Sequence, residues 1–446
     1  MSLKLSISGA RGIVGESLTP DVVTRLAAAF AEGRQGGTVL VGGDPRISGP
    51  VVRNALIAGL NGAGCSVLDC GICMTPSMLY AVKKRGAAGG VLVTASHNPI
   101  EWNALKFVGG DGFFLGAEDG ARLKAAYETG DLPWVAYDAL GSEEKGPRLF
   151  EDHRDAILNH PWIDVPAIRA RRFRVVVDGT GGAGSKDTVE LLHALGCDVV
   201  PLHCEMTGFF PRPPEPKPEN LGELCDLVKT KQAAVGFALD PDGDRLSLVA
   251  ETGRALSEEA TVALSVAHVL KKAPGPVVVN LSTSRVSEDL AANAGVPFYR
   301  TPVGEAHVSL HMREVGAAIG GEGNGGVMVP SLHPMRDAAM GMAVVLQSLT
   351  EAETGLDDQE RALPQYVILK SVVSADTFDR DDLVAALVKR FGKARVDERD
   401  GLHLSWERSW LQIRSSNTEP IVRLFAEAPT EDEAARLRDA ASEVLS

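Results

Sequence analysis

The sequence predicts an α/β protein in which three tandem related α/β domains with mixed sheets, and a smaller C-terminal α+β domain, lie around a central cleft. Three observations support this fold class. A short apolar strand that runs into a turn of small and polar residues occurs three times, at 38–44, 175–182 and 277–284. Each copy is followed by helical patterns and by a second apolar strand that ends in a polar loop. From about residue 365 the order of elements changes.

The length of the chain, 446 residues, exceeds what one hydrophobic core fills, so several domains are expected. Linkers are predicted near 140–150 and 351–365. The expected domains span 1–148, 149–254, 255–362 and 363–446.

The first repeat places a serine just beyond a buried strand. Ser48 and Pro50 follow its first strand and predict a helix cap and a first helical turn. The second strand, 89–93, leads into the loop 94–99, Thr-Ala-Ser-His-Asn-Pro, which contains Ser96. Open α/β sheets bind ligands beyond the carboxyl ends of their strands, so this loop is a candidate site.

The other two repeats carry a polar loop at the same topological place. In the second repeat, the strand 233–239 ends in 240–245, Asp-Pro-Asp-Gly-Asp-Arg. In the third repeat, the strand 316–320 ends in 321–326, Gly-Glu-Gly-Asn-Gly-Gly. The equivalent positions predict that the three loops share one cleft.

The C-terminal segment predicts a small α+β domain. Its expected elements are a strand at 366–369, a helix at 381–391, strands at 403–406, 410–413 and 421–426, and a helix at 431–445. The loop 414–420, Arg-Ser-Ser-Asn-Thr-Glu-Pro, lies between the last two strands.

Charge and composition argue against several classes of protein. The net charge of −14 argues against nucleic-acid binding, although a local arginine cluster can still hold an anionic small substrate. No apolar run reaches the length of a membrane span, and the first residues do not form a signal peptide, so we expect a cytoplasmic protein. Cys70 and Cys73 have redox or zinc spacing, but no second pair completes a zinc site, and reduced structural thiols are expected.

Three carboxylates in the loop 240–245 predict a cation site. Asp240, Asp242 and Asp244 repel one another, and oxygen-only ligands favour Mg²⁺ or Ca²⁺. An EF-hand is an alternative, but it needs glycine where Arg245 stands and helices on both flanks. A solvated acidic turn is the other alternative.

The loop that begins at Arg414 predicts a phosphate cradle. A guanidinium group, hydroxyls and an amide occur within five residues, from Arg414 through Ser416 and Asn417 to Thr418. Arg423 on the next strand can add charge. The alternative is a turn that caps a hairpin.

Two further segments carry candidate binding groups. Glu322 and Asn324 stand among four glycines, a composition that suits close approach to sugar hydroxyls or a simple glycine-rich turn. Arg11 lies between glycines, and Lys106 lies on the strand expected after the serine loop. Both cations are candidates for the site or for ordinary surface charges. His97, next to the serine, does not form a Ser-His-Asp triad by spacing.

Taken together, four segments resemble the phosphohexomutase superfamily, which comprises phosphoglucomutase, phosphomannomutase and phosphoglucosamine mutase. The segments are 94–99, 240–245, 321–326 and 414–420, in the order that the family has them, and the resemblance spans essentially the whole chain. It implies a Mg²⁺-dependent enzyme that interconverts hexose 1-phosphate and hexose 6-phosphate through a phosphoserine and a 1,6-bisphosphate, which also serves as activator. It implies hexose phosphates as partners. The sequence leaves a monomer and a homodimer both open.

The resemblance also implies roles for individual residues. Ser96 would be the phosphoserine, and its phosphate oxygen would share Mg²⁺ with Asp240, Asp242 and Asp244. The expected substrate-binding residues are Arg245, Glu322, Asn324, Arg414, Ser416, Asn417 and Thr418. The expected groups for proton transfer and charge stabilisation are Arg11, His97 and Lys106.

The chain departs from the family pattern in two places. Leu5-Ser6-Ile7 stand where Phe-Gly-Thr is usual, and Asn324 and Gly326 replace a serine and a histidine of bacterial members. The choice among glucose, mannose, glucosamine and N-acetylglucosamine phosphates therefore stays open. A non-catalytic sugar-phosphate sensor and a metal-dependent sugar phosphatase are the alternative functions.

Overall fold

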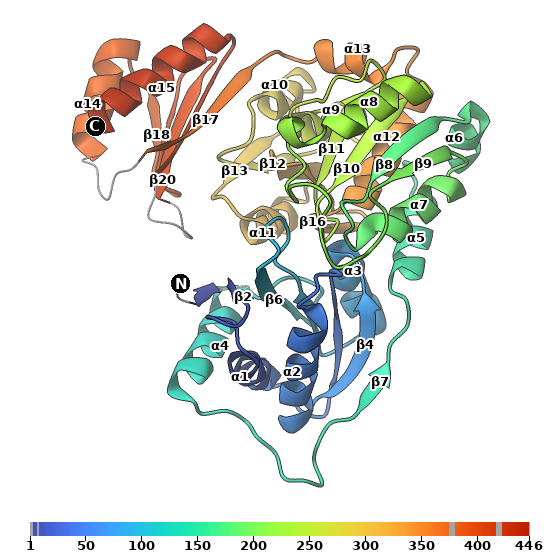
Figure 1. The fold of residues 1–446 in the computed structure, drawn as a ribbon. Helices are drawn as coiled ribbons and strands as arrows, with labels where there is room; N and C mark the ends of the chain where they lie inside the picture. The colour runs from blue at the N-terminus through green and yellow to red at the C-terminus, as the bar shows by residue number, and fades with distance from the viewer. Residues whose placement is uncertain (1–2, 7–8, 374–379, 416–421, 446) are drawn as a thin grey trace. The chain divides into compact units, whose positions relative to one another are not determined.

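The computed structural model describes residues 3–6, 9–373, 380–415 and 422–445 (Figure 1). The chain forms two compact units. Unit 1 comprises Met1–Glu258 and Met335–Asp357, and unit 2 comprises Glu259–Pro334 and Asp358–Ser446.

Unit 1 contains two mixed sheets. The strands of the first are β1 (Lys4–Ser6), β2 (Gly9–Ile13), β3 (Thr38–Gly43), β4 (Ser66–Ile72), β5 (Gly89–Val93), β6 (Trp102–Gly109) and β7 (Glu143–Lys145), in the spatial order β1-β2-β6-β5-β3-β4-β7. The strands of the second are β8 (Arg174–Asp178), β9 (Asp198–Leu202), β10 (Val235–Leu239) and β11 (Leu246–Ala250), in the order β11-β10-β8-β9.

Helices connect and cover these strands. Those in unit 1 are α1 (Pro20–Ala31), α2 (Gly49–Gly62), α3 (Thr75–Arg85), α4 (Ala117–Thr129), α5 (Phe150–Leu158), α6 (Val165–Arg171), α7 (Gly184–Ala194), the 3₁₀-helix η1 (Pro218–Asn220), α8 (Gly222–Lys231) and α12 (Ala338–Glu351), and α13 (Leu356–Arg361) begins in unit 1 and ends in unit 2.

The first sheet is buried on both faces because its central strands are apolar throughout. Val91 and Val93 of β5 pack into a core with α1, α2 and α4, whereas Leu92 packs with α3 on the other face. β5 is therefore buried along its whole length, as expected for a strand covered by helices on both sides. This buried strand leads directly into the loop that contains Ser96.

Unit 2 contains a mixed sheet and an antiparallel sheet. The strands of the mixed sheet are β12 (Val277–Asn280), β13 (Phe298–Thr301), β14 (Ile319–Glu322), β15 (Gly326–Val329) and β16 (His333–Arg336), in the order β13-β12-β14-β15-β16. The strands of the antiparallel sheet are β17 (Val367–Val373), β18 (Arg395–Asp397), β19 (Leu402–Ser405), β20 (Trp410–Ser415) and β21 (Val422–Ala428), in the order β17-β21-β20-β19-β18. The helices are α9 (Glu258–Lys272), α10 (Val286–Asn293), α11 (Glu305–Val315), α14 (Arg380–Phe391) and α15 (Glu431–Leu445).

The three predicted repeats share one topology, which confirms the expected relationship among them. The neighbouring strands run β4-β3-β5-β6 in the first, β9-β8-β10-β11 in the second and β13-β12-β14-β15 in the third. In each repeat the first two pairs are parallel and the last is antiparallel. The three polar loops thus occupy equivalent hairpins, β5–β6, β10–β11 and β14–β15.

Two local predictions are wrong. Ser48 does not cap α2 with its side chain; its hydroxyl instead accepts a hydrogen bond from Asn103 Nδ2 at 2.9 Å. The third-repeat strand begins at Ile319 rather than at Gly316, because Gly316 ends α11 in the left-handed conformation. In addition, the segment predicted as a linker near 140–150 contains β7, which pairs with β4.

Within the part of the chain that the structure describes, every helix is too short or too polar to span a lipid bilayer.

Candidate active site

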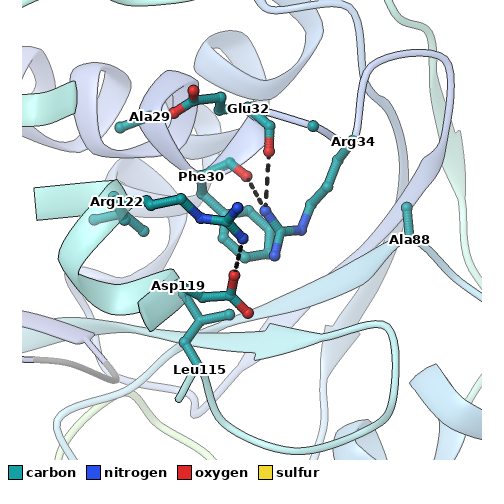
Figure 2. A pocket seen from close by; sticks show the side chains of 10 residues that line it. Ala29, Phe30, Glu32, Arg34, Ala88, Leu115, Asp119 and Arg122 are labelled. Atoms are coloured by element: carbon teal, nitrogen blue, oxygen red, sulfur yellow. Dashed lines mark hydrogen bonds and ion pairs between the residues drawn. The ribbon is translucent and has the colours of Figure 1, made fainter. Parts of the chain in front are cut away.

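A hollow of about 490 Å³ in unit 1 lies apart from the residues that the sequence singles out (Figure 2). Phe30, Arg34, Asp119 and Arg122 line it, and none of the predicted site residues does. Arg34 lies near Gly89, the first residue of β5, and so at the opposite end of that strand from the serine loop. The serine loop, with the candidate catalytic residue Ser96, follows the carboxyl end of β5.

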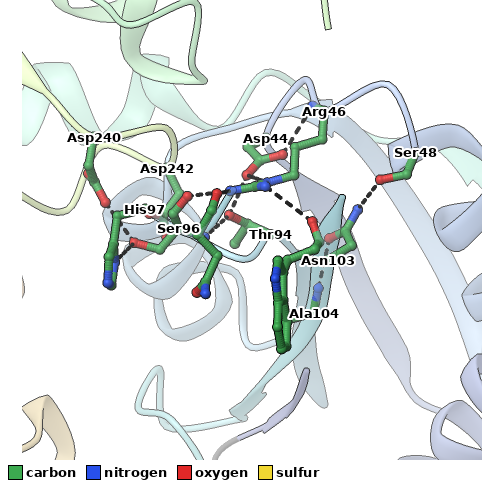
Figure 3. A network of polar contacts seen from close by, with 12 residues as sticks. Asp44, Arg46, Ser48, Thr94, Ser96, His97, Asn103, Ala104, Asp240 and Asp242 are labelled. Carbon is green, nitrogen blue, oxygen red and sulfur yellow. Dashed lines mark hydrogen bonds and ion pairs between the residues drawn. The ribbon is translucent and has the colours of Figure 1, made fainter. Parts of the chain in front are cut away.

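Ser96 lies within hydrogen-bond distance of the aspartate loop. Its Oγ donates to Asp240 Oδ2 at 2.7 Å and lies 3.4 Å from His97 Nδ1 (Figure 3). Ser96 is 3% exposed and has a φ of 51°, in the left-handed region that non-glycine residues rarely adopt. A serine and an aspartate 144 positions apart are thus adjacent, as the shared-cleft prediction requires for the first two repeats.

The three aspartates form one buried cluster. Asp240, Asp242 and Asp244 are 0% exposed, and one carboxylate oxygen of each lies within 4.8 Å of the others. Gly243 adopts a φ of 71°, which allows the tight turn, and a Cβ there would lie 2.6 Å from Met74 Cε. The sharp turn brings alternate carboxylates to one side.

This cluster fits a divalent cation. Asp242 Oδ1 and Asp244 Oδ1 are buried and have no hydrogen-bond partner among the described residues, which leaves two carboxylate oxygens to be satisfied. Burial and the neighbouring carboxylates raise the pKa of Asp240 well above its ordinary value. The donor set consists of oxygen alone, which suits Mg²⁺ or Ca²⁺.

Lys106 on β6 partly balances the cluster. Its Nζ lies 2.6 Å from Asp242 Oδ2 and 3.8 Å from Asp244 Oδ2. Burial by itself lowers the pKa of Lys106, but the two carboxylates outweigh it and raise the pKa above the ordinary value. Burial likewise favours a neutral Asp242, yet Lys106 holds the pKa of that carboxyl below its usual range.

The remaining predicted cations of unit 1 surround the same loops. The backbone N–H of Arg245 donates to Asp240 Oδ1 at 3.2 Å, and Arg11 Nη1 donates to Asn98 Oδ1 at 2.5 Å. Partial burial, together with the guanidinium groups of Arg245 and Arg11, holds the pKa of His97 well below its ordinary value. The site therefore combines a serine, a carboxylate cluster and several positive groups.

Sequence reasoning missed four residues of this site. Arg336 Nη2 donates to Asp244 Oδ2 at 2.7 Å, and Thr75 Oγ1 donates to Asp242 Oδ2 at 2.5 Å. Asp44 and Arg46, directly after β3, hold the serine loop. Of these four residues, only Asp44 and Arg46 could have been found from the sequence. They follow the first strand of their repeat, β3, and polar residues also stand where the corresponding strands β8 and β12 end.

In unit 2, Glu322 is buried at the end of β14. Its Oε1 accepts hydrogen bonds from Asn280 Nδ2 at 2.7 Å and from the Gly304 N–H at 3.0 Å. Asn324 is half-buried, and its Oδ1 has no hydrogen-bond partner in the structure. Among the described residues, this buried amide oxygen is therefore left unsatisfied.

Arg414 and Arg423 lie directly opposite each other on β20 and β21. Like charges at such a pair repel, so an anion bound between them would relieve the repulsion. Arg414 Nε lies 3.5 Å from Asp400 Oδ1, which offsets part of its charge. Ser416, Asn417 and Thr418, predicted to complete the phosphate cradle, lie outside the described residues.

Sequence comparison places the chain in a family. Profiles described as phosphoglucomutase/phosphomannomutase, alpha/beta/alpha domains I, II and III, match residues 3–133, 151–253 and 257–366, and the C-terminal domain profile matches 375–444. The chain belongs to the alpha-D-phosphohexomutase superfamily and is therefore an enzyme of the isomerase class.

Individual relatives are similar over nearly their whole length. A protein of Thermococcus kodakarensis named "Phosphoglucomutase/phosphomannomutase" is 36% identical, over 96% of this chain and 94% of that protein. One of Methanopyrus kandleri named "Probable phosphoglucosamine mutase" is 34% identical, over 97% and 95%. The crystal structure of a phosphoglucomutase/phosphomannomutase family protein from Burkholderia thailandensis matches with a TM-score of 0.86 and 27% identity, over 100% and 98%.

Proposed function

We propose that this phosphohexomutase transfers a phosphoryl group through Ser96 and a hexose 1,6-bisphosphate, with Mg²⁺ held by Asp240, Asp242 and Asp244. The observation that carries the proposal is the 2.7 Å contact between Ser96 Oγ and Asp240 Oδ2. It brings a hydroxyl that can carry a phosphoryl group against a carboxylate cluster that fits a divalent cation. When bound, Mg²⁺ would offset negative charge on the transferring group.

The first half-reaction begins with phosphorylated Ser96. A free hydroxyl of the hexose monophosphate attacks the phosphorus; a bond forms between the sugar oxygen and phosphorus, and the bond to Ser96 Oγ breaks. The hydroxyl proton passes to a base, and Oγ takes up a proton. After the bisphosphate turns around, Ser96 Oγ attacks its other phosphate and the same bonds form and break in reverse.

The sequence leaves His97 and Lys106 as candidates for the base, and we propose His97, because its lowered pKa keeps the imidazole neutral, whereas the carboxylates raise the pKa of Lys106 and keep its Nζ protonated. Both side chains lie beside the reacting loops, His97 at 3.4 Å from Ser96 Oγ and Lys106 at 2.6 Å from Asp242. Arg11 and Arg245 would stabilise charge on the phosphoryl group. Replacing each base candidate by alanine separates them, because loss of the base lowers kcat far more than loss of a charge that only assists binding.

In unit 2, we propose that Glu322 and Asn324 bind sugar hydroxyls and that Arg414 and Arg423 bind the phosphate that does not react. The buried carboxylate, the amide oxygen without a partner and the cross-strand pair of guanidinium groups support these roles. Arg414→Ala is expected to raise KM for hexose phosphates at least tenfold. An unchanged KM would remove this strand pair from the site.

The test of the proposed function is Ser96→Ala, with Ser66→Ala in the same sheet as control. Alanine has a Cβ like serine, so the φ of 51° adds no new strain and the fold is expected to remain. Each variant is assayed with the 1-phosphates of glucose, mannose, glucosamine and N-acetylglucosamine, Mg²⁺ and a trace of the matching bisphosphate. We expect Ser96→Ala to lose turnover and Ser66→Ala to keep it.

An assay of inorganic phosphate runs beside the mutase assay. Phosphate release without isomerisation would identify a phosphatase, and binding without either reaction would identify a sensor. Substantial isomerisation by Ser96→Ala would refute the role of the serine.

A further inference from the structure

We propose that Arg46 is a positioning residue, which fixes the backbone of the serine loop, residues 94–99, so that Ser96 Oγ faces the aspartate cluster. The inference rests on the proposed function and deepens it. Arg46 follows β3 and is only 1% exposed, although arginine is seldom so buried without partners for its charge. The contacts of the Arg46 side chain explain why a buried guanidinium group is stable here.

The guanidinium group of Arg46 binds the backbone of the serine loop and of Trp102, the first residue of β6. Nη1 donates to the carbonyl oxygens of Pro99 at 2.7 Å and Trp102 at 3.1 Å. Nη2 donates to the carbonyl oxygens of Asn98, at 2.9 Å, and Ser96. One planar group with five N–H donors can satisfy these carbonyls together, whereas a lysine ammonium cannot reproduce the fork.

Asp44 holds both Arg46 and the other side of the loop (Figure 3). Its carboxylate accepts from Arg46 Nε at 3.0 Å and from Thr94 Oγ1 at 2.6 Å. Thr94 Oγ1 in turn accepts from the Ser96 N–H at 3.0 Å. One buried hydrogen-bond network, with Asp44 and Arg46 at its centre, therefore holds both the N–H and the C=O of Ser96.

The serine needs this support because of its backbone conformation. A non-glycine residue in the left-handed region is strained and persists only where surrounding contacts impose it. If the loop relaxed, the φ of 51° would change and Ser96 Oγ would move away from Asp240. Arg46 touches no reacting atom, so its effect is on position alone.

The second repeat contains a similar arrangement, which is an independent observation. Arg212 Nε donates to Asp178 Oδ2 at 2.6 Å, and Arg212 Nη2 donates to the carbonyl oxygen of Leu239 at 2.8 Å. Asp178 is the last residue of β8, whereas Asp44 directly follows β3, and Leu239 immediately precedes the aspartate loop. In both repeats an arginine that is paired with an aspartate near the end of the first strand donates to a backbone carbonyl of the functional hairpin.

The experiment compares Arg46→Lys and Arg46→Ala with wild type. We expect Arg46→Lys to lower kcat at least thirtyfold while KM stays within threefold, because the substrate-binding groups are elsewhere. In Arg46→Ala, added guanidinium ion is expected to restore kcat at least tenfold. Phosphorylation of Ser96 by the bisphosphate, followed by intact mass, is expected to slow in parallel with kcat.

Arg34→Lys is the matched control. Arg34 Nη1 also donates to backbone carbonyls, those of Phe30 and Glu32, and its guanidinium group lies over the Phe30 ring (Figure 2). It is near the amino end of β5, away from Ser96. We expect this variant to keep kcat within twofold. Such a result would show that the loss of kcat in Arg46→Lys does not follow from the loss of just any arginine–carbonyl contact.

The outcomes separate the two claims. If Arg46→Lys keeps kcat within threefold, or if Arg46→Ala gains nothing from guanidinium at a concentration that leaves the wild type active, the positioning role is wrong. In either case the proposed function still stands, provided that Ser96→Ala is inactive. Turnover by Ser96→Ala would refute the proposed function itself.

Discussion

The carboxyl group of Glu427 gives the stability of unit 2 a pH dependence that can be calculated. Glu427 lies on β21 and is fully buried. It accepts hydrogen bonds from Ser284 Oγ, from the Arg285 N–H at 2.9 Å and from Trp410 Nε1. Burial outweighs these donors and raises the pKa of Glu427 to about 6, from 4.5.

The sign follows from proton binding. Between the two pKa values the folded state binds more proton than the unfolded state, so the stability that this group contributes is present at low pH and is lost as pH rises through about 6. A shift of this size corresponds to about 2 kcal/mol, most of which is lost between pH 4.5 and 7.5.

The perturbation is Glu427→Gln, which removes the titrating group at nearly constant volume. Urea unfolding of the wild type and the variant, followed by tryptophan fluorescence, is measured at several pH values in this range. The difference between the two free energies of unfolding, wild type minus variant, is expected to fall by about 1–2 kcal/mol from pH 4.5 to 7.5. Titration of other groups cancels in this difference. A difference that is constant or rises with pH would refute the reasoning.

Three shorter predictions concern unit 1. Gly243→Ala is expected to cost about 1–3 kcal/mol, seen as a lower Tm, because of its φ of 71° and the approach to Met74; an unchanged Tm would contradict this. Burial raises the pKa of Cys73 well above 9, so the native protein should leave this thiol unmodified by a thiol reagent at pH 8, whereas rapid labelling would contradict its burial. Asp244→Asn should raise the Mg²⁺ concentration for half-maximal activity at least tenfold, and an unaltered Mg²⁺ dependence would exclude Asp244 as a ligand.

The sequence predicted the repeats and their loops because both depend on local patterns. The apolar runs around Val91 and Val176 specify buried strands by composition alone, and the polar loops stand out where those runs end. The residue types in these loops, a serine and alternating aspartates, indicated chemistry without knowledge of the fold. The strand registers and the common spatial order of the repeats required the structure.

The residues that were missed act over long separations in sequence. Thr75 and Asp242 are 167 positions apart, and Arg336 meets Asp244 across 92 positions. From the sequence alone, Arg46 is indistinguishable from a surface charge in a turn; its contacts with the serine loop appear only in the structure. The misplaced cap at Ser48 has the same cause, because a distant partner, Asn103, takes up its hydroxyl. Local propensity does not determine which distant group a side chain meets.

The central claim is that the hydroxyl of Ser96 carries the phosphoryl group, and mass spectrometry of the native enzyme tests it most directly. The protein is incubated with a hexose 1,6-bisphosphate and Mg²⁺, and its peptides are then mapped. We predict a gain of about 80 Da, the mass of one phosphoryl group, on the peptide with Ser96, and its loss when the matching hexose monophosphate is added. Phosphate on another residue, or on none while the enzyme turns over, would contradict the account.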